Sequence, residues 1–286
     1  MMEIWLKARE NKDLFTMHRV ERCLYRAKSQ YQDLAVVDSP QFGRMLLLDG
    51  VIQTTIRDEP AYHEMIAHVP LFAHPGPKRV LIIGGGDGGT LREVLRHPEV
   101  EEAHLVEIDA QVIEASRRYL PELAVGFDDA RVEVHIADGI KHVQEAKDLY
   151  DVVIVDSCDP LGPAVGLFNY DFYRNVRGAL RKDGILVAQI ESPFFNMDLV
   201  KQVYGSFTKL YPIVRPYLTS IPSYSPGIWS FMLASKKHDP RKAKREPADS
   251  WELRYYTSEL HRAAFALPAY YCQALEETAE VADRAG

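Results

Sequence analysis

Hydrophobic and polar residues follow two different patterns, which divide the chain near its beginning. In the N-terminal part, short apolar runs are separated by turn-forming residues, as is typical of antiparallel β-strands. Runs at 34–37 and 45–48 are of this kind, and Asp49-Gly50 before the run 51–56 indicates a β-hairpin. We therefore predict a small antiparallel β-domain over residues 1–66, whose strand edges are free to pair in an oligomer.

In the second part, residues 67–286, strand patterns alternate with helix patterns. A helix is expected from Tyr62 to the helix breaker His74-Pro-Gly-Pro77. Beyond it, short apolar runs suit buried strands, and the segments between them show helical periodicity. The expected strands are 79–83, 103–108, 132–136, 150–155 and 184–190, and the expected helices are about 90–97, 110–119, 139–147, 170–181 and 197–210.

This alternation predicts a largely parallel sheet with helices on both faces. Two further apolar runs, 213–221 and 228–235, follow each other without a long helix and indicate an antiparallel pair at the end of the sheet. The predicted fold class is therefore α/β: a Rossmann-like sheet of the methyltransferase type, preceded by the small β-domain. The polar segment 238–249 is expected to be a loop, and helices are expected again at about 257–265 and 269–281.

Composition and charge narrow the range of partners. The 286 residues carry a net charge of −7, which argues against a general nucleic-acid or anionic-membrane surface. The basic run 241–245 is short and lacks aromatic residues, so we expect it to be a solvated loop. Three widely spaced cysteines, at 23, 158 and 272, fit neither a disulfide framework nor a zinc site. The start is too polar for a signal peptide and no apolar run approaches the ~18 residues of a membrane helix, so we expect a cytoplasmic protein.

The first expected strand leads into a glycine-rich loop with one acidic residue, Asp87. Glycine lets a ligand approach the backbone closely, and the loop satisfies the dinucleotide pattern G-x-G-x-x-G at Gly84, Gly86 and Gly89. Thr90 is expected to cap the following helix in a capping box with Glu93. A pyrophosphate prefers positive potential in such a loop, which Asp87 opposes. The carboxylate suits instead a ligand that carries an ammonium group.

The next two strands also end in acidic residues, at the sheet edge where α/β folds bind ligands. Glu107 lies twenty residues after Asp87, the distance of a carboxylate that binds a ribose diol. The alternative is that Asp109 caps a helix and Glu107 forms a salt bridge. Asp138-Gly139 has two interpretations. It is either a plain turn or a site where the carboxylate of Asp138 faces the exocyclic amine of a purine. Together these residues suggest a bound adenosine.

The fourth strand ends in two carboxylates, Asp156 and Asp159. At the mouth of an apolar pocket they repel each other unless a cation is bound, and a polyamine supplies one. One of them is suited to accept the proton of an attacking amine. The alternatives are a metal site or two capping acids, but no histidine or cysteine ligand set accompanies them. Tyr62 and Tyr224 suit either the wall of an ammonium site or plain core packing.

These residues resemble the polyamine aminopropyltransferases, the spermidine synthase family. The likeness runs almost end to end, from Tyr31 to Phe265. The motifs that carry it are Leu48-Asp-Gly-Val-Ile-Gln53, Tyr62-His-Glu-Met65, Gly84-Gly-Gly-Asp-Gly-Gly89, Glu107-Ile-Asp109, Asp156-Ser-Cys-Asp-Pro-Leu-Gly-Pro-Ala164 and the loop around Tyr224.

The resemblance implies a role for each residue of this set. For the donor, decarboxylated S-adenosylmethionine, Asp87 would hold the amine, Glu107 the ribose and Asp138 the adenine. The other implied donor-binding residues are Gln32, Gln53, Gly84, Gly86 and Gly139. Asp156 would be the general base, with Tyr62 as its catalytic partner. The other implied acceptor-binding residues are His63, Asp87, Asp159, Gln189 and Tyr224.

The implied activity is aminopropyl transfer to putrescine, which gives spermidine and methylthioadenosine. Because the donor is a co-substrate, neither a cofactor nor a metal is expected. The implied partners are these small molecules and further copies of the chain, in a homodimer or homotetramer built through the N-terminal domain. Three positions depart from the commonest pattern: Cys158, the order Tyr224-Ser-Pro-Gly227, and Gln202. The last two belong to the acceptor end, so agmatine, cadaverine or a longer amine stay open.

Other classes of function remain as alternatives. An amine N-methyltransferase that uses S-adenosylmethionine can share this scaffold, but Asp87 favours a donor without a carboxylate. A nicotinamide dehydrogenase rests on the glycine pattern alone, and Asp87 argues against it. A non-catalytic binding module is disfavoured because both Asp156 and Asp159 are present.

Overall fold

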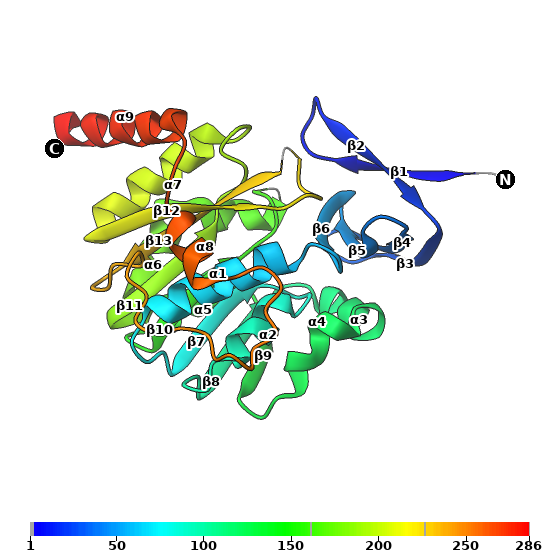
Figure 1. Ribbon diagram of the computed structural model, residues 1–286, viewed down its shortest axis with the longest axis horizontal. Coiled ribbons are helices and arrows are strands. Elements are labelled where there is room, and N and C mark those ends of the chain that lie inside the picture. The colour runs from blue at the N-terminus through cyan, green and yellow to red at the C-terminus, as the bar shows by residue number, and fades with distance from the viewer. Residues whose placement is uncertain (1–2, 161, 226, 286) are drawn as a thin grey trace.

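An all-β beginning is followed by regular alternation of strands and helices, as the hydrophobic pattern predicts. The computed structural model describes residues 3–160, 162–225 and 227–285 (Figure 1). Leu161 and Pro226, which belong to two of the sequence motifs, lie outside the described residues.

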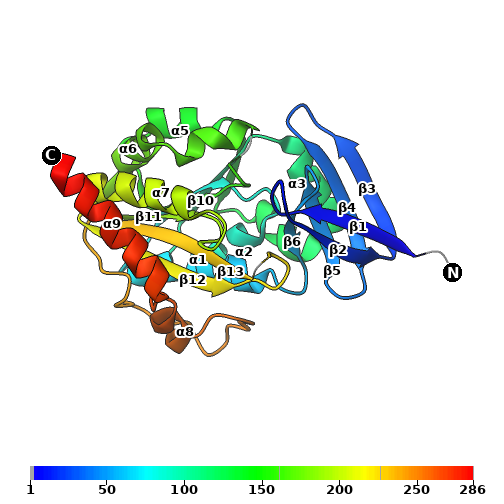
Figure 2. The same ribbon diagram turned by 90° about the horizontal axis from the view of Figure 1, so that it is seen from above.

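The N-terminal part forms two antiparallel units. The hairpin β1 (Ile4–Arg9) and β2 (Phe15–Val20) lies beside a four-stranded sheet of order β3-β4-β5-β6, as Figure 2 shows. These four strands are β3 (Arg22–Lys28), β4 (Asp33–Ser39), β5 (Gly43–Leu48) and β6 (Val51–Thr55). Asp49 and Gly50 both have positive φ, 50° and 79°, which is the geometry that a two-residue hairpin turn requires. The hairpin predicted from Asp49-Gly50 is thereby confirmed.

The second sheet has seven strands in the order β12-β13-β11-β10-β7-β8-β9. Five neighbouring strands, from β11 to β9, pair in parallel, while β13 runs antiparallel to its two neighbours, β11 and β12. The predicted mixed sheet with an antiparallel pair at its end is therefore confirmed. The strands are β7 (Arg79–Gly84), β8 (Glu102–Glu107), β9 (Val132–Ile136), β10 (Tyr150–Asp156), β11 (Leu180–Gln189), β12 (Ile213–Ser220) and β13 (Ile228–Ser235).

Helices cover both faces of this sheet (Figure 1). They are α1 (Pro60–Ala73), α2 (Gly89–Leu95), α3 (Ala110–Tyr119), α4 (Pro121–Ala124), α5 (Gly139–Glu145), α6 (Tyr170–Ala179), α7 (Met197–Leu210), α8 (Ser258–Ala263) and α9 (Ala269–Ala285). Val80 and Ile82 of β7 pack with α1 and α2, while Leu81 and Ile83 pack in the cluster that includes α5, α6 and α7. Adjacent strand residues thus bury opposite faces, which explains the continuous apolar run.

Helix α1 connects the two sheets, and the boundary expected at residue 66 falls inside it. A second contact joins the two parts: Leu34 and Leu46 of the small sheet pack against Val112 of α3 and Leu123 of α4. The two parts are therefore held together by a continuous helix and by an apolar cluster, so their facing edges can share one pocket.

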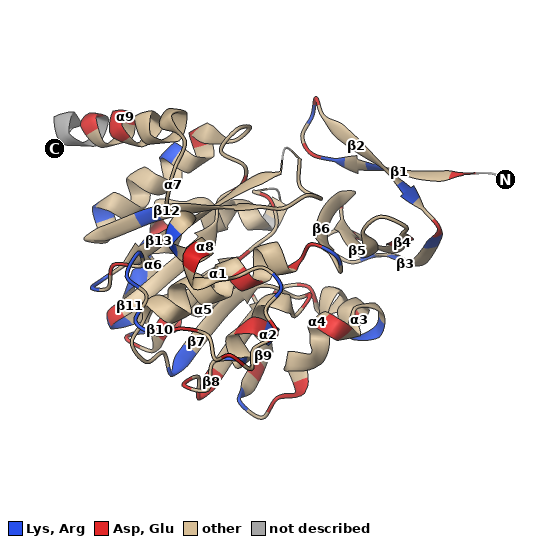
Figure 3. Cartoon of the chain, in the orientation of Figure 1, with Lys and Arg blue, Asp and Glu red and all other residues tan. Residues whose placement is uncertain are grey.

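The polar loop after β13 is irregular and mostly exposed, as expected, and it is anchored to the protein through Arg245. Figure 3 shows that Lys and Arg are interspersed with Asp and Glu over the chain. Arg241 pairs with Asp239, and Arg245 pairs with Glu99 while its Nη2 donates to the carbonyl of Leu71 at 2.7 Å. Basic side chains bind free carbonyls at the end of a helix, and α1 offers such carbonyls here.

None of the helices in the described part of the chain has the length and apolar character needed to cross a membrane.

We expect Ile154→Ala, in the central strand β10, to lower the free energy of unfolding by about 2–5 kcal/mol, because Ile154 is fully buried and a cavity remains. Ile136→Ala on the edge strand β9, where Ile136 is 53% exposed, is the matched control and should cost less than about 1 kcal/mol. Urea unfolding at fixed protein concentration measures both. Equal losses would contradict the assignment of β10 to the core.

Candidate active site

A pocket opens where the parallel strands end, between the seven-stranded sheet and the N-terminal sheet. The structure brings all fourteen residues that the sequence singled out into its lining: Gln32, Gln53, Tyr62, His63, Gly84, Gly86, Asp87, Glu107, Asp138, Gly139, Asp156, Asp159, Gln189 and Tyr224. They come from both sheets, from α1 and from the loops that follow the strands. Their roles remain proposals, but their common location is now a structural fact.

The glycine loop packs directly against the end of β10. A Cβ on Gly84, whose φ is +84°, would lie 2.1 Å from the carbonyl oxygen of Asp156. The amide of Gly85 donates to that same oxygen at 2.9 Å. A Cβ on Gly86 would lie 2.9 Å from Oε2 of Glu107. These glycines are therefore required because carboxylate-bearing strands approach the loop closely, whatever the ligand.

Thr90 does not cap α2, so the predicted capping box is wrong. The helix begins after Gly88, whose φ is 89°, without a side-chain cap. The Thr90 hydroxyl instead donates to Oδ2 of Asp156 at 2.6 Å, and Glu93 pairs with His68, Arg92 and Arg96. Thr90 already lies inside the helix, past the capping position, and its hydroxyl points to the carboxylate, which is a strong acceptor.

Asp156 is held by two hydroxyl donors. Tyr62 donates to Oδ1 at 2.7 Å, and Thr90 donates to Oδ2. Burial and the nearby charge of Asp87 raise the pKa of Asp156, while His63 and the two hydroxyls act in the opposite sense. Burial and the charge of Asp156 also raise the pKa of Tyr62, so the tyrosine keeps its proton. This carboxylate can therefore accept a proton from a substrate near neutral pH.

Asp87 lies in the loop between β7 and α2 with both oxygens engaged. Its Oδ1 accepts from the amide of Gly89 at 2.7 Å, and its Oδ2 lies 3.3 Å from Nε2 of His63. Burial alone would raise the pKa of Asp87, but the charge and hydrogen bond of His63 lower it. The side chain is therefore ionised and oriented before any ligand arrives.

Glu107 and Asp138 line the pocket beside the glycine loop, at the ends of the next two strands, β8 and β9. Burial and the charge of Asp109 raise the pKa of Glu107 to about 7, although the amide of Asp109 donates to its Oε1 at 2.9 Å. Asp109 itself caps α3 by accepting from Gln111, as the alternative for this residue predicted, and also accepts from Gln32 Nε2 at 3.0 Å. Asp138 caps α5 and lines the pocket at the same time. Carboxylates at two strand ends can thus accept hydrogen bonds from hydroxyl or amine groups of a ligand.

The other end of the pocket is acidic. Glu10, Asp159 and Glu191 all line it. Burial, together with the charge of Asp159, raises the pKa of Glu10 to about 7 and lifts the pKa of Glu191 well above its ordinary value. These three carboxylates resist ionisation because their negative charges would repel one another. A bound positive charge relieves this repulsion, so the three form a site for a cation.

Sequence reasoning missed Glu10 and Glu191. Glu191 follows β11 by two residues, so the strand-end rule that found Asp156 applies to it equally. Glu10 follows β1 in the hairpin, where nothing in the local sequence points to a pocket; its Oε2 accepts from the amide of Ser225 at 3.2 Å. Gln202 was expected near the acceptor, but its Nε2 donates to the carbonyl of Phe168, because α7 packs against α6 there.

The remaining predicted residues shape the wall. The Tyr224 hydroxyl donates to the carbonyl of Gln53, and its ring lies 6.2 Å from the ring of Tyr62. Gln189 Nε2 donates to the carbonyl of Ser157 at 3.0 Å and so holds the loop after β10. Cys158 lies in this loop, where burial and the charge of Asp159 raise its pKa to about 12, so it stays a neutral thiol.

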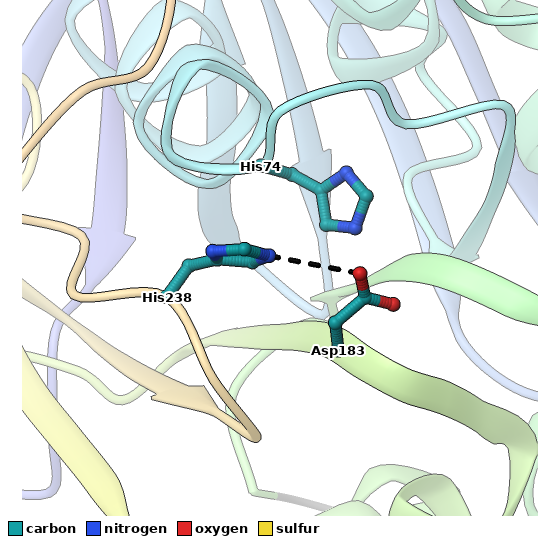
Figure 4. Close-up of side chains that lie close together, drawn as sticks. All are labelled: His74, Asp183 and His238. Carbon is teal, nitrogen blue, oxygen red and sulfur yellow. Dashed lines mark ion pairs between the residues drawn. The ribbon is translucent and has the colours of Figure 1, made fainter.

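Among the described residues, two groups of potential metal ligands lie outside the pocket. In the first, His238 Nε2 is 3.7 Å from Oδ2 of Asp183 and His74 lies beside them (Figure 4). The amide of Gly76 donates to Nδ1 of His74, which places the proton of that ring on Nε2, toward the group. A protonated nitrogen offers no lone pair, so this arrangement does not favour a metal. The second group consists of His104, Glu133 and His135.

Comparison with known proteins agrees with this geometry. A family model described as spermine/spermidine synthase domain matches residues 59–244, and one described as spermidine synthase tetramerisation domain matches residues 4–55. The polyamine aminopropyltransferase of Caldicellulosiruptor saccharolyticus is 52% identical over 275 residues, which are 96% of this chain and 99% of that protein. That of Moorella thermoacetica is 51% identical over 280 residues, covering 98% and 99%.

Solved structures show the same relationship. The crystal structure of spermidine synthase from Thermotoga maritima has a TM-score of 0.89 and 42% identity, covering 96% of this chain and 94% of that one. A spermidine synthase in complex with the transition state analogue AdoDATO has a TM-score of 0.90 and 42% identity, covering 96% and 95%. The fold is thus that of a Rossmann-like transferase. The chain belongs to the polyamine aminopropyltransferase, or spermidine synthase, family and is an aminopropyltransferase.

Removing the Thr90 hydroxyl should make Asp156 harder to ionise. We expect Thr90→Val to raise the pKa on the acidic side of the kcat/KM profile by about one unit, because a hydrogen bond to the carboxylate is lost. Activity should fall at low pH and recover on the alkaline plateau, where Asp156 is ionised in both proteins. Thr90→Ser keeps the hydroxyl and is the control. An unshifted profile in the valine variant would contradict the role of this bond.

Proposed function

We propose that the protein transfers the aminopropyl group of decarboxylated S-adenosylmethionine to putrescine, giving spermidine and methylthioadenosine. The observation that carries the proposal is the partly buried carboxylate of Asp156, held by Tyr62 and Thr90 between two carboxylate-lined ends of one pocket. Family membership supports the reaction class. The structure of a relative with the transition state analogue AdoDATO supports a nucleoside donor joined to an amine.

The donor fits the side of the pocket lined by the glycine loop. We assign its ribose to Glu107, its adenine to Asp138 with Gly139, and its ammonium to Asp87. Gln32, Gln53, Gly84 and Gly86 complete this side. Ordinary S-adenosylmethionine carries a carboxylate beside its ammonium, which the ionised Asp87 repels. Asp87 thus disfavours the alternative of an N-methyltransferase.

The reaction needs a base and an aligned amine. The positive sulfur of the donor makes the neighbouring aminopropyl carbon electrophilic. As the amine nitrogen forms the new C–N bond, the C–S bond breaks and its electron pair stays on sulfur, so methylthioadenosine leaves neutral. Asp156 takes the proton that the nitrogen loses, and Tyr62 holds Asp156 in place.

The acceptor fits the acidic end of the pocket. A diamine places its attacking nitrogen near Asp156 and its second ammonium, with a free pKa near 10, among Glu10, Asp159 and Glu191. Gln189, Tyr224 and His63 complete the wall. This distribution favours a diamine over a monoamine. Agmatine and cadaverine also carry a distal cation and are the alternative acceptors.

We also propose that copies of the chain assemble through the N-terminal part, as a homotetramer. The family model matched by residues 4–55 is described as a tetramerisation domain. The hairpin β1–β2 exposes four large apolar side chains, namely Ile4, Trp5, Phe15 and Met17. Exposed apolar patches of this kind mark interaction sites.

An amine panel tests the donor and the acceptor together. The purified protein is offered decarboxylated or ordinary S-adenosylmethionine, each with putrescine, cadaverine, agmatine or butylamine, and the products are identified by mass. We expect spermidine from putrescine with the decarboxylated donor, and little product from butylamine, which has the same chain length but lacks the second amine. Methylated amine without an aminopropyl product would refute the proposal, while preference for another diamine would refute only the acceptor.

We expect Asp156→Asn to lower kcat by about 10²–10⁴-fold, because the amide cannot accept the proton, while the affinity for methylthioadenosine is retained. Steady-state kinetics and calorimetry measure the two effects. Turnover near the wild-type value would remove Asp156 from the role of base.

A further inference from the structure

A row of charged side chains lies behind the glycine loop. Glu59, the residue before α1, has a side chain only 1% exposed, and its Oε2 lies 2.7 Å from Nδ1 of His63, one helical turn later. The other ring nitrogen of His63, Nε2, lies 3.3 Å from Oδ2 of Asp87. Because both ring nitrogens face carboxylates, both act as donors, and the ring is an imidazolium between two negative charges.

The ring has little freedom to move. A Cβ on Gly89 would lie 2.2 Å from Cε1 and Nδ1 of His63, so only glycine leaves room for the ring. The amide of Gly89 fixes the other oxygen of Asp87. Arg92 Nη2 donates to Oε2 of Glu59 at 2.8 Å, and Arg254 donates to its Oε1. Glu59 is therefore anchored from α2 and from the segment before α8.

The charges of Asp87 and His63 cancel each other, so Glu59 decides the net charge of the three groups. Asp87 and His63 alone would form a closed ion pair with no net charge. Burial lowers the pKa of His63, but the charges and hydrogen bonds of Asp87 and Glu59 outweigh it and raise the pKa to about 10. With Glu59 present, Glu59, His63 and Asp87 together carry one net negative charge. Arg92 and Arg254 add positive charge, but they bind Glu59, whereas Asp87 and His63 line the pocket.

We propose that Glu59 is a positioning residue that acts through His63: it fixes the ring against Asp87 and balances the ring's charge, so that Asp87 keeps a net negative charge for an ammonium group. The inference rests on the proposed function, in which Asp87 receives the ammonium of the donor. It also assigns His63 a fixed charge, so His63 offers no lone pair to a substrate proton, and Asp156 is left as the base.

The first test is an NMR titration of the His63 ring in the ligand-free full chain. In the wild type, His63 should stay protonated through neutral pH. In Glu59→Gln its pKa should fall by about 1–3 units, because an opposite charge in contact has been removed. The charged and titratable groups that face His63 are Glu59 before α1, Asp87 in the loop after β7, Arg92 on α2, Asp156 at the end of β10, and Tyr62. A wild-type ring that titrates near the ordinary value of about 6.5 overturns the proposal without any variant.

The second test compares two ligands that differ by the aminopropyl group: decarboxylated S-adenosylmethionine and methylthioadenosine. At about pH 6.5, Glu59→Gln should bind the first about tenfold more weakly than wild type does, because protonated His63 now neutralises Asp87. At about pH 9 the loss should shrink, since His63 loses its proton in the variant while the ammonium keeps its own. Binding of methylthioadenosine should be unchanged at both pH values. Calorimetry measures all four affinities.

Two variants separate charge from structure. Glu59→Asp keeps the charge and should restore most of the affinity at about pH 6.5. Glu64→Gln alters another buried carboxylate of α1, which binds the backbone amides of residues 254–256, and should leave the His63 titration near that of the wild type. If wild type does not prefer the decarboxylated donor to methylthioadenosine, the proposed donor fails. If it does, and Glu59→Gln shows the same preference at both pH values, only the present inference fails.

Discussion

The close approach of the glycine loop to the end of β10 is the constraint on which the site depends. Gly84 pairs with Asp156 in parallel register, and any side chain at Gly84 would strike the Asp156 backbone. This contact brings Asp87, at the end of one strand, near Asp156, at the end of the next. Two buried carboxylates so close are costly unless cations or hydroxyl donors face them. The rest of the pocket supplies these: Tyr62 and Thr90 donate to Asp156, and His63 neutralises part of the charge.

Burial and charge therefore divide the pocket into parts with different tasks. Around Asp87 the carboxylate charge is fixed by His63 and the Gly89 amide before a ligand arrives. Among the described residues, Glu10, Asp159 and Glu191 form no ion pair, and only the more distant charge of Arg9 acts on Asp159, so these groups hold protons or bind a cationic ligand. A carboxylate that is preorganised beside an acidic end that a cation would complete is consistent with the proposed reaction between a nucleoside sulfonium and an amine.

Several contacts that complete the pocket cross between the two sheets. Gln32 of the N-terminal part donates to Asp109, Glu10 accepts from Ser225, and the Tyr224 hydroxyl donates to the carbonyl of Gln53. The N-terminal part thus forms a wall of the pocket as well as carrying the exposed apolar hairpin. Loops that lack a packed core of their own gain fixed positions from such contacts.

The sequence by itself determined the alternation of strands and helices, the antiparallel end of the sheet and the acidic strand ends, because periodicity and turn chemistry are local properties. It also predicted that the acidic residues after the parallel strands meet at one edge, since parallel strands end together. Only the tertiary structure decided which partner each side chain takes. The hydroxyl of Thr90 serves Asp156 rather than its own helix, and Gln202 faces Phe168 rather than the pocket. Glu10 reaches the acidic end of the pocket from a distant hairpin, a contact between remote segments that no local pattern encodes.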